Sequence, residues 1–143
     1  MLGLILSENK GMIKIELRCL LKGNDFSADK IVEETGVIFN SVREYNFKKD
    51  SPFKRFRKVA TILPKENGIY DVDDNKLINK FSSFIKDKVA SINASGCEKI
   101  VLAMDVWHDD QCNMSFFNST FKAISESFDD IDISCYEDDE GRI

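Results

Sequence analysis

Residues 100–107 read Ile-Val-Leu-Ala-Met-Asp-Val-Trp, and this stretch decides the fold. Its apolar residues do not alternate with polar ones, so a strand built from it has two apolar faces. Such a strand is stable only where other side chains cover it on both sides. The run therefore predicts an interior strand of a sheet. The chain of 143 residues is long enough to build the core that this strand needs.

The sequence before this run predicts further strands. Residues 12–21 alternate between apolar and polar side chains, which is typical of a half-buried antiparallel strand. Its apolar side consists of Ile13, Ile15, Leu17, Cys19 and Leu21. Residues 37–63 indicate more extended structure, which Pro64 ends. The first strand is expected to pair with its neighbours through one buried face.

Three helices are expected. Ser27 can cap a short helix that runs to about Thr35, with Gly36 at the C′ position. Residues 75–94 carry an apolar stripe at helical spacing, which predicts one long helix. A second long helix is expected to begin after Ser115, which can act as its N-cap. The apolar stripe of this second helix consists of Phe117, Phe121, Ile124 and Phe128.

The last part of the chain predicts one more strand. Ile131, Ile133 and Cys135 are expected to point inward, and the polar residues between them outward. The elements then follow the order β-α-β-β-α-β-α-β. We expect an α+β fold, in which two long helices cover a mainly antiparallel sheet as a two-layer sandwich.

The chain is expected to form a single domain over residues 1–143. Met12 could equally be the start of the protein, which would make residues 1–11 an upstream extension. Residues 137–143 are expected to form a solvated acidic tail. The sequence holds no run of about 18 apolar residues for a membrane span, and its four cysteines are scattered. We therefore expect free thiols, no membrane contact and a cytoplasmic location.

Charge is distributed unevenly along the chain. Residues 105–143 hold 2 basic and 11 acidic side chains, whereas residues 1–104 hold 18 basic and 14 acidic ones. Within the first part, residues 43–58 hold seven basic and two acidic side chains. Blocks of like charge often mark interaction surfaces, although solvated faces give the same pattern.

Candidate catalytic and metal-binding motifs are weak. His108 stands near Asp109, Asp110 and Cys112, but no second pair of ligand residues completes a structural zinc site. A nucleophile pair of Cys112 and His108 is compatible with the spacing, but nothing else in the sequence indicates acyl transfer. The oxygen-rich run 71–75 lacks the glycine and the terminal glutamate of an EF-hand loop. We expect no enzymatic activity, no metal and no cofactor.

The basic segment 48–58 has one feature of a nucleic-acid site. Phe47, Phe53 and Phe56 are interleaved with its lysines and arginines, so base stacking could accompany phosphate neutralisation. The net charge of −5 argues against this role, because the whole domain would repel a polyanion. A strand protected from edge-to-edge aggregation by Lys and Arg explains the segment better. Nucleic acid is therefore not expected as the partner.

Two parts of the sequence resemble a bacterial family of small α+β proteins of unknown function. The first is Gly-Asn-Asp-Phe-Ser-Ala-Asp-Lys-Ile at residues 23–31, after the first strand, followed by Glu-Thr-Gly-Val at residues 34–37. The second is the helix and Asp-Ile-Asp-Ile strand of residues 117–133, followed by Tyr136. Some small acidic proteins of this kind are similar to the immunity proteins of contact-dependent inhibition systems. The resemblance implies that the partner is the C-terminal domain of a cognate toxin.

The predicted function is that of an immunity-type inhibitor, which covers the basic active site of a toxin domain, such as a nuclease. Its acidic surface would attract the toxin, and a buried anchor residue would supply most of the affinity. The candidate partner-binding residues are Asp109, Asp110, Asp129, Asp130, Asp132, Tyr136, Glu137, Asp138 and Asp139. The alternative is a regulatory module that binds a small molecule or peptide without catalysis. An apolar cavity under the 75–94 helix would favour this alternative, and the oligomeric state is left open.

Overall fold

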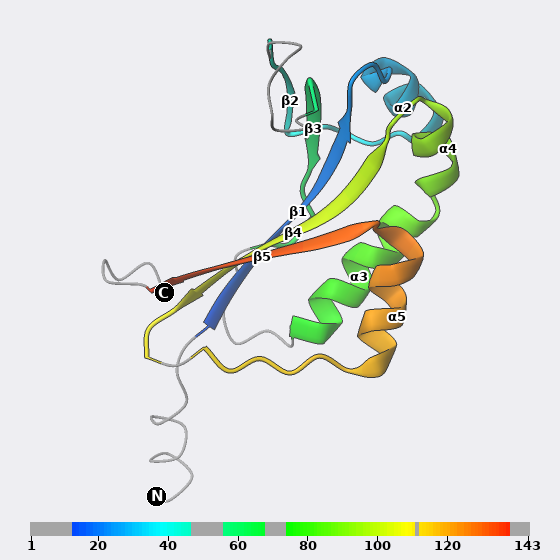
Figure 1. The fold of residues 1–143 in the computed structure, drawn as a ribbon. Helices are drawn as coiled ribbons and strands as arrows, with labels where there is room; N and C mark the ends of the chain where they lie inside the picture. Colours follow the sequence, from blue (N-terminus) through cyan, green and yellow to red (C-terminus); the bar gives the residue numbers. More distant parts are fainter. Residues whose placement is uncertain (1–12, 47–55, 68–73, 111, 138–143) are drawn as a thin grey trace, which may run out of the picture.

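The computed structural model describes residues 13–46, 56–67, 74–110 and 112–137 and has an α+β fold (Figure 1). Five strands form one sheet, and the helices lie on one side of it. The elements in chain order are β1 (Ile13–Gly23), α2 (Ala28–Thr35), β2 (Ser41–Glu44), β3 (Lys58–Ile62), α3 (Asp74–Lys86), α4 (Val89–Ala94), β4 (Lys99–His108), α5 (Asn118–Ser127) and β5 (Asp130–Glu137).

The sheet is mixed, with the strand order β2-β3-β1-β4-β5. β1 pairs antiparallel with both β3 and β4, and β2 pairs antiparallel with β3. β5 instead runs parallel to β4. The connection through α5 carries the chain back to the end of the sheet at which β4 begins, so β5 repeats the direction of β4.

The core lies between the sheet and the helices. The alternating residues of β1 face this core as predicted, and Leu17 and Cys19 are fully buried there. The register places Leu17 opposite Met104 and Cys19 opposite Leu102, which are also fully buried. On the other face of β4, Val101 is 2% exposed. The structure therefore confirms β4 as an interior strand that is covered on both faces.

The start and end of α2 agree with the prediction. The Ser27 side chain accepts a hydrogen bond from the Lys30 N–H, at 3.2 Å, and so satisfies a free donor of the first turn. Gly36 follows the helix with φ of 72°, in the left-handed region that favours glycine. Its N–H donates to the Val32 carbonyl at 2.8 Å. Local sequence chemistry is sufficient to define this helix.

The single helix predicted over residues 75–94 is wrong, because α3 ends at Lys86 and α4 begins at Val89. In a continuous helix, the Phe84 carbonyl would accept from the N–H of Lys88. Instead, the Lys88 N–H donates to Ile85, and the Lys88 ammonium donates to the Phe84 carbonyl at 2.9 Å. The same ammonium lies 3.8 Å from the centroid of the Phe84 ring. The lysine side chain therefore replaces a helical hydrogen bond where the two helices separate.

The predicted second long helix is shorter than expected and begins later. Phe117, not Ser115, is the N-cap of α5, and it makes no side-chain capping bond. Asn75 of α3 supplies the missing contacts, since its Oδ1 accepts from the Phe117 N–H at 3.0 Å and its Nδ2 donates to the Ser115 carbonyl at 2.7 Å. Only half of the predicted stripe is buried: Ile124 and Phe128 are 7% exposed, but Phe121 is 54% exposed.

The inward-facing side predicted for the last strand is also not buried. All eight residues of β5 are exposed, including Ile131 at 37% and Ile133 at 48%. Their register with Leu102 and Met104 does place them on the face that bears the helices. However, β5 is the outermost strand, so a neighbouring strand covers it on one side only.

The free edge of β1 is covered by a side chain rather than by a strand. β3 pairs with β1 only from Cys19 to Gly23. Beyond that point, the Asn67 Oδ1 accepts from the Leu17 N–H at 2.8 Å, and its Nδ2 donates to the Leu17 carbonyl at 3.0 Å. The amide side chain of Asn67 thus forms the two hydrogen bonds to the Leu17 backbone that a further residue of β3 would otherwise have formed.

Several predictions concern residues outside the described ranges. These are the extension 1–11, most of the basic segment 48–58, the aspartates of the run 71–73 and the acidic tail after Glu137, with Asp138 and Asp139. Among the helices of the described ranges, each is too short or too polar to cross a membrane.

Candidate functional site

The first group of candidate acidic residues lies where β5 begins. The Asp129 carboxylate accepts from the Ile100 N–H at 2.8 Å, and the Asp129 N–H donates to the Ile100 carbonyl at 2.7 Å. Asp130 forms an ion pair of 2.8 Å with Lys99, and this hydrogen bond raises the pKa of Lys99. Two of the three carboxylates here thus bind the neighbouring strand, which leaves Asp132 without an ion pair among the described residues.

The second group lies where β5 ends. The register places Tyr136 beside Trp107 and Glu137 beside His108. The Trp107 and Tyr136 rings stack, with 4.6 Å between their centroids and 24° between their planes. In the adjoining turn, the Asp109 carboxylate accepts from the Asp110 N–H at 2.7 Å. This end of the strand therefore combines an exposed tyrosine, stacked on a half-buried tryptophan, with nearby carboxylates.

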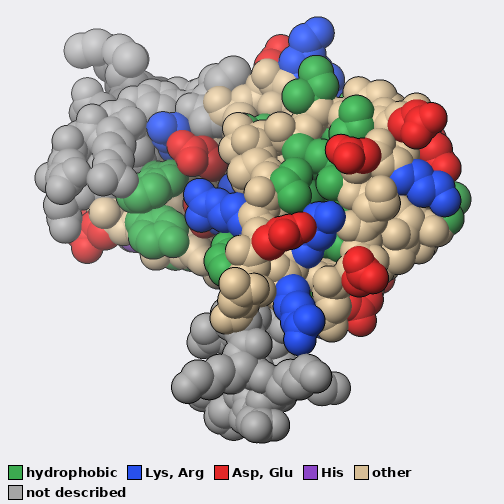
Figure 2. Space-filling view, turned by 90° about the horizontal axis from the view of Figure 1, so that it is seen from above, with side chains coloured by type: hydrophobic (Ala, Val, Ile, Leu, Met, Phe, Trp, Pro, Cys, Tyr) green, Lys and Arg blue, Asp and Glu red, His purple; other side chains and the backbone are tan. Residues whose placement is uncertain are grey.

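The candidate residues consequently form a strip along β5 rather than one compact cluster. Eight residues of a strand span about 26 Å, so the two groups cannot contact the same side chain of a partner. Figure 2 shows Lys and Arg side chains interspersed with Asp and Glu on the face seen there, without a broad field of one sign. Asp130, Asp132, Tyr136 and Glu137 lie on the edge strand itself, whereas Asp129 directly precedes it and Asp109 and Asp110 lie in the turn after β4.

β5 is also an unpaired edge. β4 is its only neighbour among the described strands. In a parallel pair, every second residue of a strand directs its N–H and C=O groups away from the partner. β5 therefore presents a ladder of backbone donors and acceptors on its outer side. Such an edge can accept an additional strand from another chain.

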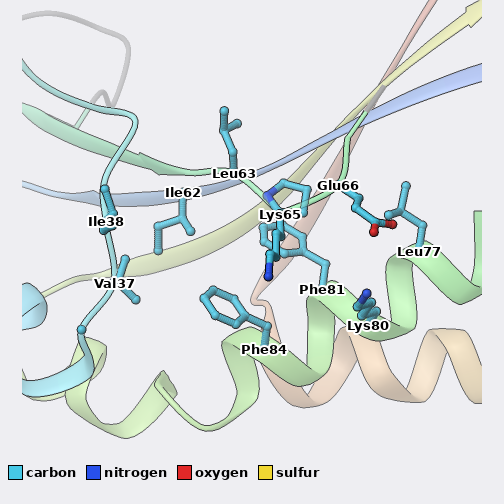
Figure 3. Close-up of a pocket in the computed structure, with 12 residues that line it drawn as sticks. Val37, Ile38, Ile62, Leu63, Lys65, Glu66, Leu77, Lys80, Phe81 and Phe84 are labelled. Atoms are coloured by element: carbon cyan, nitrogen blue, oxygen red, sulfur yellow. The ribbon is translucent and has the colours of Figure 1, made fainter. Parts of the chain in front are cut away.

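A second candidate site is an apolar pocket of about 360 Å³ under α3. Residues 36–38 after α2, residues 62–66 at and after the end of β3, and one side of α3 form its walls. Figure 3 shows Val37 and Ile38 on one side of the pocket and Phe81 and Phe84 on the other. Such a volume lies at the lower end of the range for small-molecule sites.

The mouth of this pocket combines exposed apolar groups with lysines. Ile38 is 86% exposed and Phe84 is 44% exposed, so both are open to a ligand. Lys65 and Lys80 line the pocket together with one acidic residue, Glu66. Figure 3 shows Lys65 extending from the segment after β3 toward α3. Neither lysine is within ion-pair distance of a carboxylate in the described part of the chain.

The four cysteines differ in their surroundings. Cys19 and Cys97 are buried, whereas Cys112 and Cys135 are exposed. Burial raises the pKa of Cys19 strongly and raises that of Cys97 to about 11. The two buried thiols are therefore protonated near neutral pH, which makes them poor nucleophiles. Over the described ranges, no three His, Cys, Asp or Glu side chains are grouped to hold a metal ion.

Sequence reasoning identified the strand that carries Asp130, Asp132 and Glu137, but it did not identify the pocket. The pocket walls come from three separate segments, and only α3 has a periodic pattern. Comparisons with protein-family models, with curated proteins and with solved structures each find no match for this chain.

Proposed function

We propose that this protein binds a partner protein by accepting an extended, basic segment along β5. Within this class, we propose an immunity-type inhibitor that covers the basic active site of a toxin domain in the cytoplasm. The family resemblance supplies the biological role, and the edge strand supplies the mode of binding. The protein itself then needs no catalytic group or cofactor, because inhibition follows from occlusion.

The observation that carries the proposal is the composition of the exposed edge. One face of β5 holds Asp130, Asp132, Ser134 and Tyr136, and the other holds Ile131, Ile133 and Cys135, with Glu137 at its end. An added strand would pair with the free backbone groups, and its alternate side chains would meet these two faces. Basic residues on one side and apolar residues on the other would complement them.

The same composition disfavours a second copy of this chain as the occupant. Two β5 strands side by side would bring six carboxylates together, from Asp130, Asp132 and Glu137 of each copy, with no basic side chain on either strand. Like charges that are brought close together repel each other. A basic strand from a different protein has no such penalty.

The aromatic pair at the end of the strand is a suitable anchor. Tyr136 is 42% exposed and stacks on Trp107, so a partner could bury the rest of its ring without ordering a flexible side chain. Asp132 lies on the same face of β5 as Tyr136, whereas the side chain of Glu137 lies on the opposite face. An arginine of the partner could therefore stack on the ring from the face that also carries the aspartates.

Binding can be tested with the capped peptide Arg-Val-Arg-Val-Arg-Val-Arg-Val and with its Glu-Val counterpart. Trp107 is the single tryptophan, so its fluorescence reports on the edge. We expect the Arg peptide to bind and the Glu peptide not to bind. The double substitution Asp130→Lys and Asp132→Lys, on the face that would meet the arginines, should weaken binding about tenfold or more, since each reversed pair changes the binding free energy by roughly 1 kcal/mol.

The matched control is the double substitution Glu33→Lys and Glu34→Lys, which makes the same change in net charge on exposed positions of α2. It should alter binding of the Arg peptide less than about twofold, because exposed charges far from the edge are screened. Equal losses in the two double variants would mean that only overall charge matters and would refute binding at β5.

The immunity role needs a separate test. Co-expression with the product of the adjacent gene should relieve growth arrest caused by that product, and the Asp130→Lys, Asp132→Lys variant should relieve it less. An adjacent product that is not toxic, or whose toxicity this protein does not relieve, would contradict the role while leaving peptide binding at β5 intact.

A regulatory module that binds a small molecule or peptide is the second candidate function. The apolar pocket under α3 is the observation that favours it.

A further inference from the structure

We infer that the pocket under α3 binds a small amphiphile that has one anionic group and an apolar body, such as a medium-chain carboxylic acid. This inference rests on the second candidate function and is independent of partner binding at β5. It follows from three properties of the pocket: its walls, its charge and its opening to solvent.

The walls favour an apolar body. Ile62 and Phe81 are each 2% exposed and form the inner part of the lining, while Ile38 and Phe84 continue it to the surface at 86% and 44% exposed. A hydrocarbon chain placed there would bury these exposed apolar surfaces, which stabilises the complex in proportion to the area removed from water. The volume of about 360 Å³ suits a compact ligand and not a folded partner.

The charges favour an anionic head group. Two lysines and one glutamate line the pocket, so the lining carries a net positive charge. A third cation, Lys88, lies 3.8 Å from the centroid of the Phe84 ring and adds to the positive potential near the mouth. A carboxylate at the mouth could approach Lys65 and Lys80 while its chain lies against Phe84. A cationic or neutral amphiphile would gain the apolar contacts but not this attraction.

The pocket is built on rigid supports, which reduces the cost of binding. Gly36 turns the chain out of α2 in the left-handed conformation and so directs Val37, which is 2% exposed, into the core. On the opposite wall, Phe81 packs against Phe84 and Phe128, with ring centroids 6.5 Å and 6.2 Å apart. A site whose walls are already ordered loses little conformational entropy when a ligand enters.

The test is a titration with decanoate, decanol and decyltrimethylammonium, read from displacement of the fluorescent anion 1-anilinonaphthalene-8-sulfonate and from calorimetry. Decanoate should bind with a stoichiometry of one, and more tightly than the other two. Lys65→Glu and Lys80→Glu should each weaken decanoate binding about fivefold, a value within reach of one partly exposed ion pair. The same two substitutions should leave decanol binding unchanged.

Lys122→Glu is the matched control, because Lys122 is an exposed lysine on α5, outside the pocket. It should leave decanoate binding unchanged, and Phe84→Ala should weaken both decanoate and decanol. Equal affinity for decanoate and decanol, no binding of either, or an unchanged decanoate affinity in a Lys65→Glu, Lys80→Glu double variant would overturn the inference. That double variant should still bind the Arg-Val peptide, so failure at the pocket is distinguishable from failure at β5.

Discussion

Phe81→Ala should lower the free energy of unfolding by about 3–5 kcal/mol, the usual cost of removing a large aromatic ring from a core. Phe81 is 2% exposed and contacts Phe128, the C-cap residue of α5, with ring centroids 6.2 Å apart. Its loss would leave a cavity between α3, α5 and the sheet. Urea denaturation followed by circular dichroism measures the change.

Phe84→Ala is the control for this prediction. Phe84 lies on the same helix and stacks against Phe81, but it is 44% exposed. Its truncation removes less buried surface and leaves no closed cavity, so we expect a loss below about 1.5 kcal/mol. Similar losses for the two substitutions would show that Phe81 does not hold the two helices together as described.

Asn75→Ala should lower the free energy of unfolding by about 2–3 kcal/mol, because it breaks two hydrogen bonds at a site that is 6% exposed. The substitution frees the Phe117 N–H and the Ser115 carbonyl, to which the Asn75 amide is bonded at 3.0 Å and 2.7 Å. These groups lie where the chain enters α5. Amide exchange of the first turn of α5 should therefore accelerate more than exchange in β1.

Asn79→Ala is the matched substitution on the same helix. The buried Oδ1 of Asn79 has no hydrogen-bond partner among the described residues, so its removal deletes no such bond. We expect a change smaller than about 1 kcal/mol. If Asn79→Ala were as destabilising as Asn75→Ala, the two bonds of Asn75 would not explain its effect.

Local patterns predicted the parts of the fold that depend on neighbours in the sequence. The alternation of residues 12–21 corresponds to β1, and the apolar run of residues 100–107 corresponds to β4. Ser27 and Gly36 delimit α2 because each acts on backbone groups within four residues of itself. These features need no information about distant parts of the chain.

The features that the sequence did not predict depend on contacts between distant segments. The side chain of Asn75, and not that of the nearby Ser115, forms the hydrogen bonds to the backbone where α5 begins. No local sequence motif indicates that a distant asparagine takes this role. The parallel pairing of β5 follows from the path of the whole crossover, and its exposure follows from its place at the edge. The alternation of Ile131 and Ile133 identified one face correctly. It could not show that, among the described strands, β5 is the outermost one and has no neighbour on its far side.

The candidate sites divide in the same way. Acidic residues are visible in a sequence, but their ion pairs are not: Asp130 is paired with Lys99, which lies 31 residues earlier. The pocket unites residues from after α2, from the end of β3 and from α3. The sequence predicts a cavity under the 75–94 helix only for the alternative function, a ligand-binding module. The pocket is found there, and the amphiphile titration tests whether it binds a ligand.

The central claim, that β5 receives a partner strand, is tested most directly by the reactivity of Cys135. This thiol is exposed on β5, while Cys19 and Cys97 are buried with raised pKa values and should react slowly at pH 8. In a Cys112→Ser background, iodoacetamide should therefore modify Cys135 first. An added strand would cover it, because the thiol lies on the outermost strand of the sheet.

At four times the dissociation constant of the Arg-Val peptide, about four fifths of the protein is bound, so the rate of Cys135 modification should fall about fivefold. The Glu-Val peptide should leave the rate unchanged. Trp107 fluorescence reports on binding in the same sample. If fluorescence shows the Arg-Val peptide bound while Cys135 reacts at its original rate, the partner does not lie along β5 and the account is wrong.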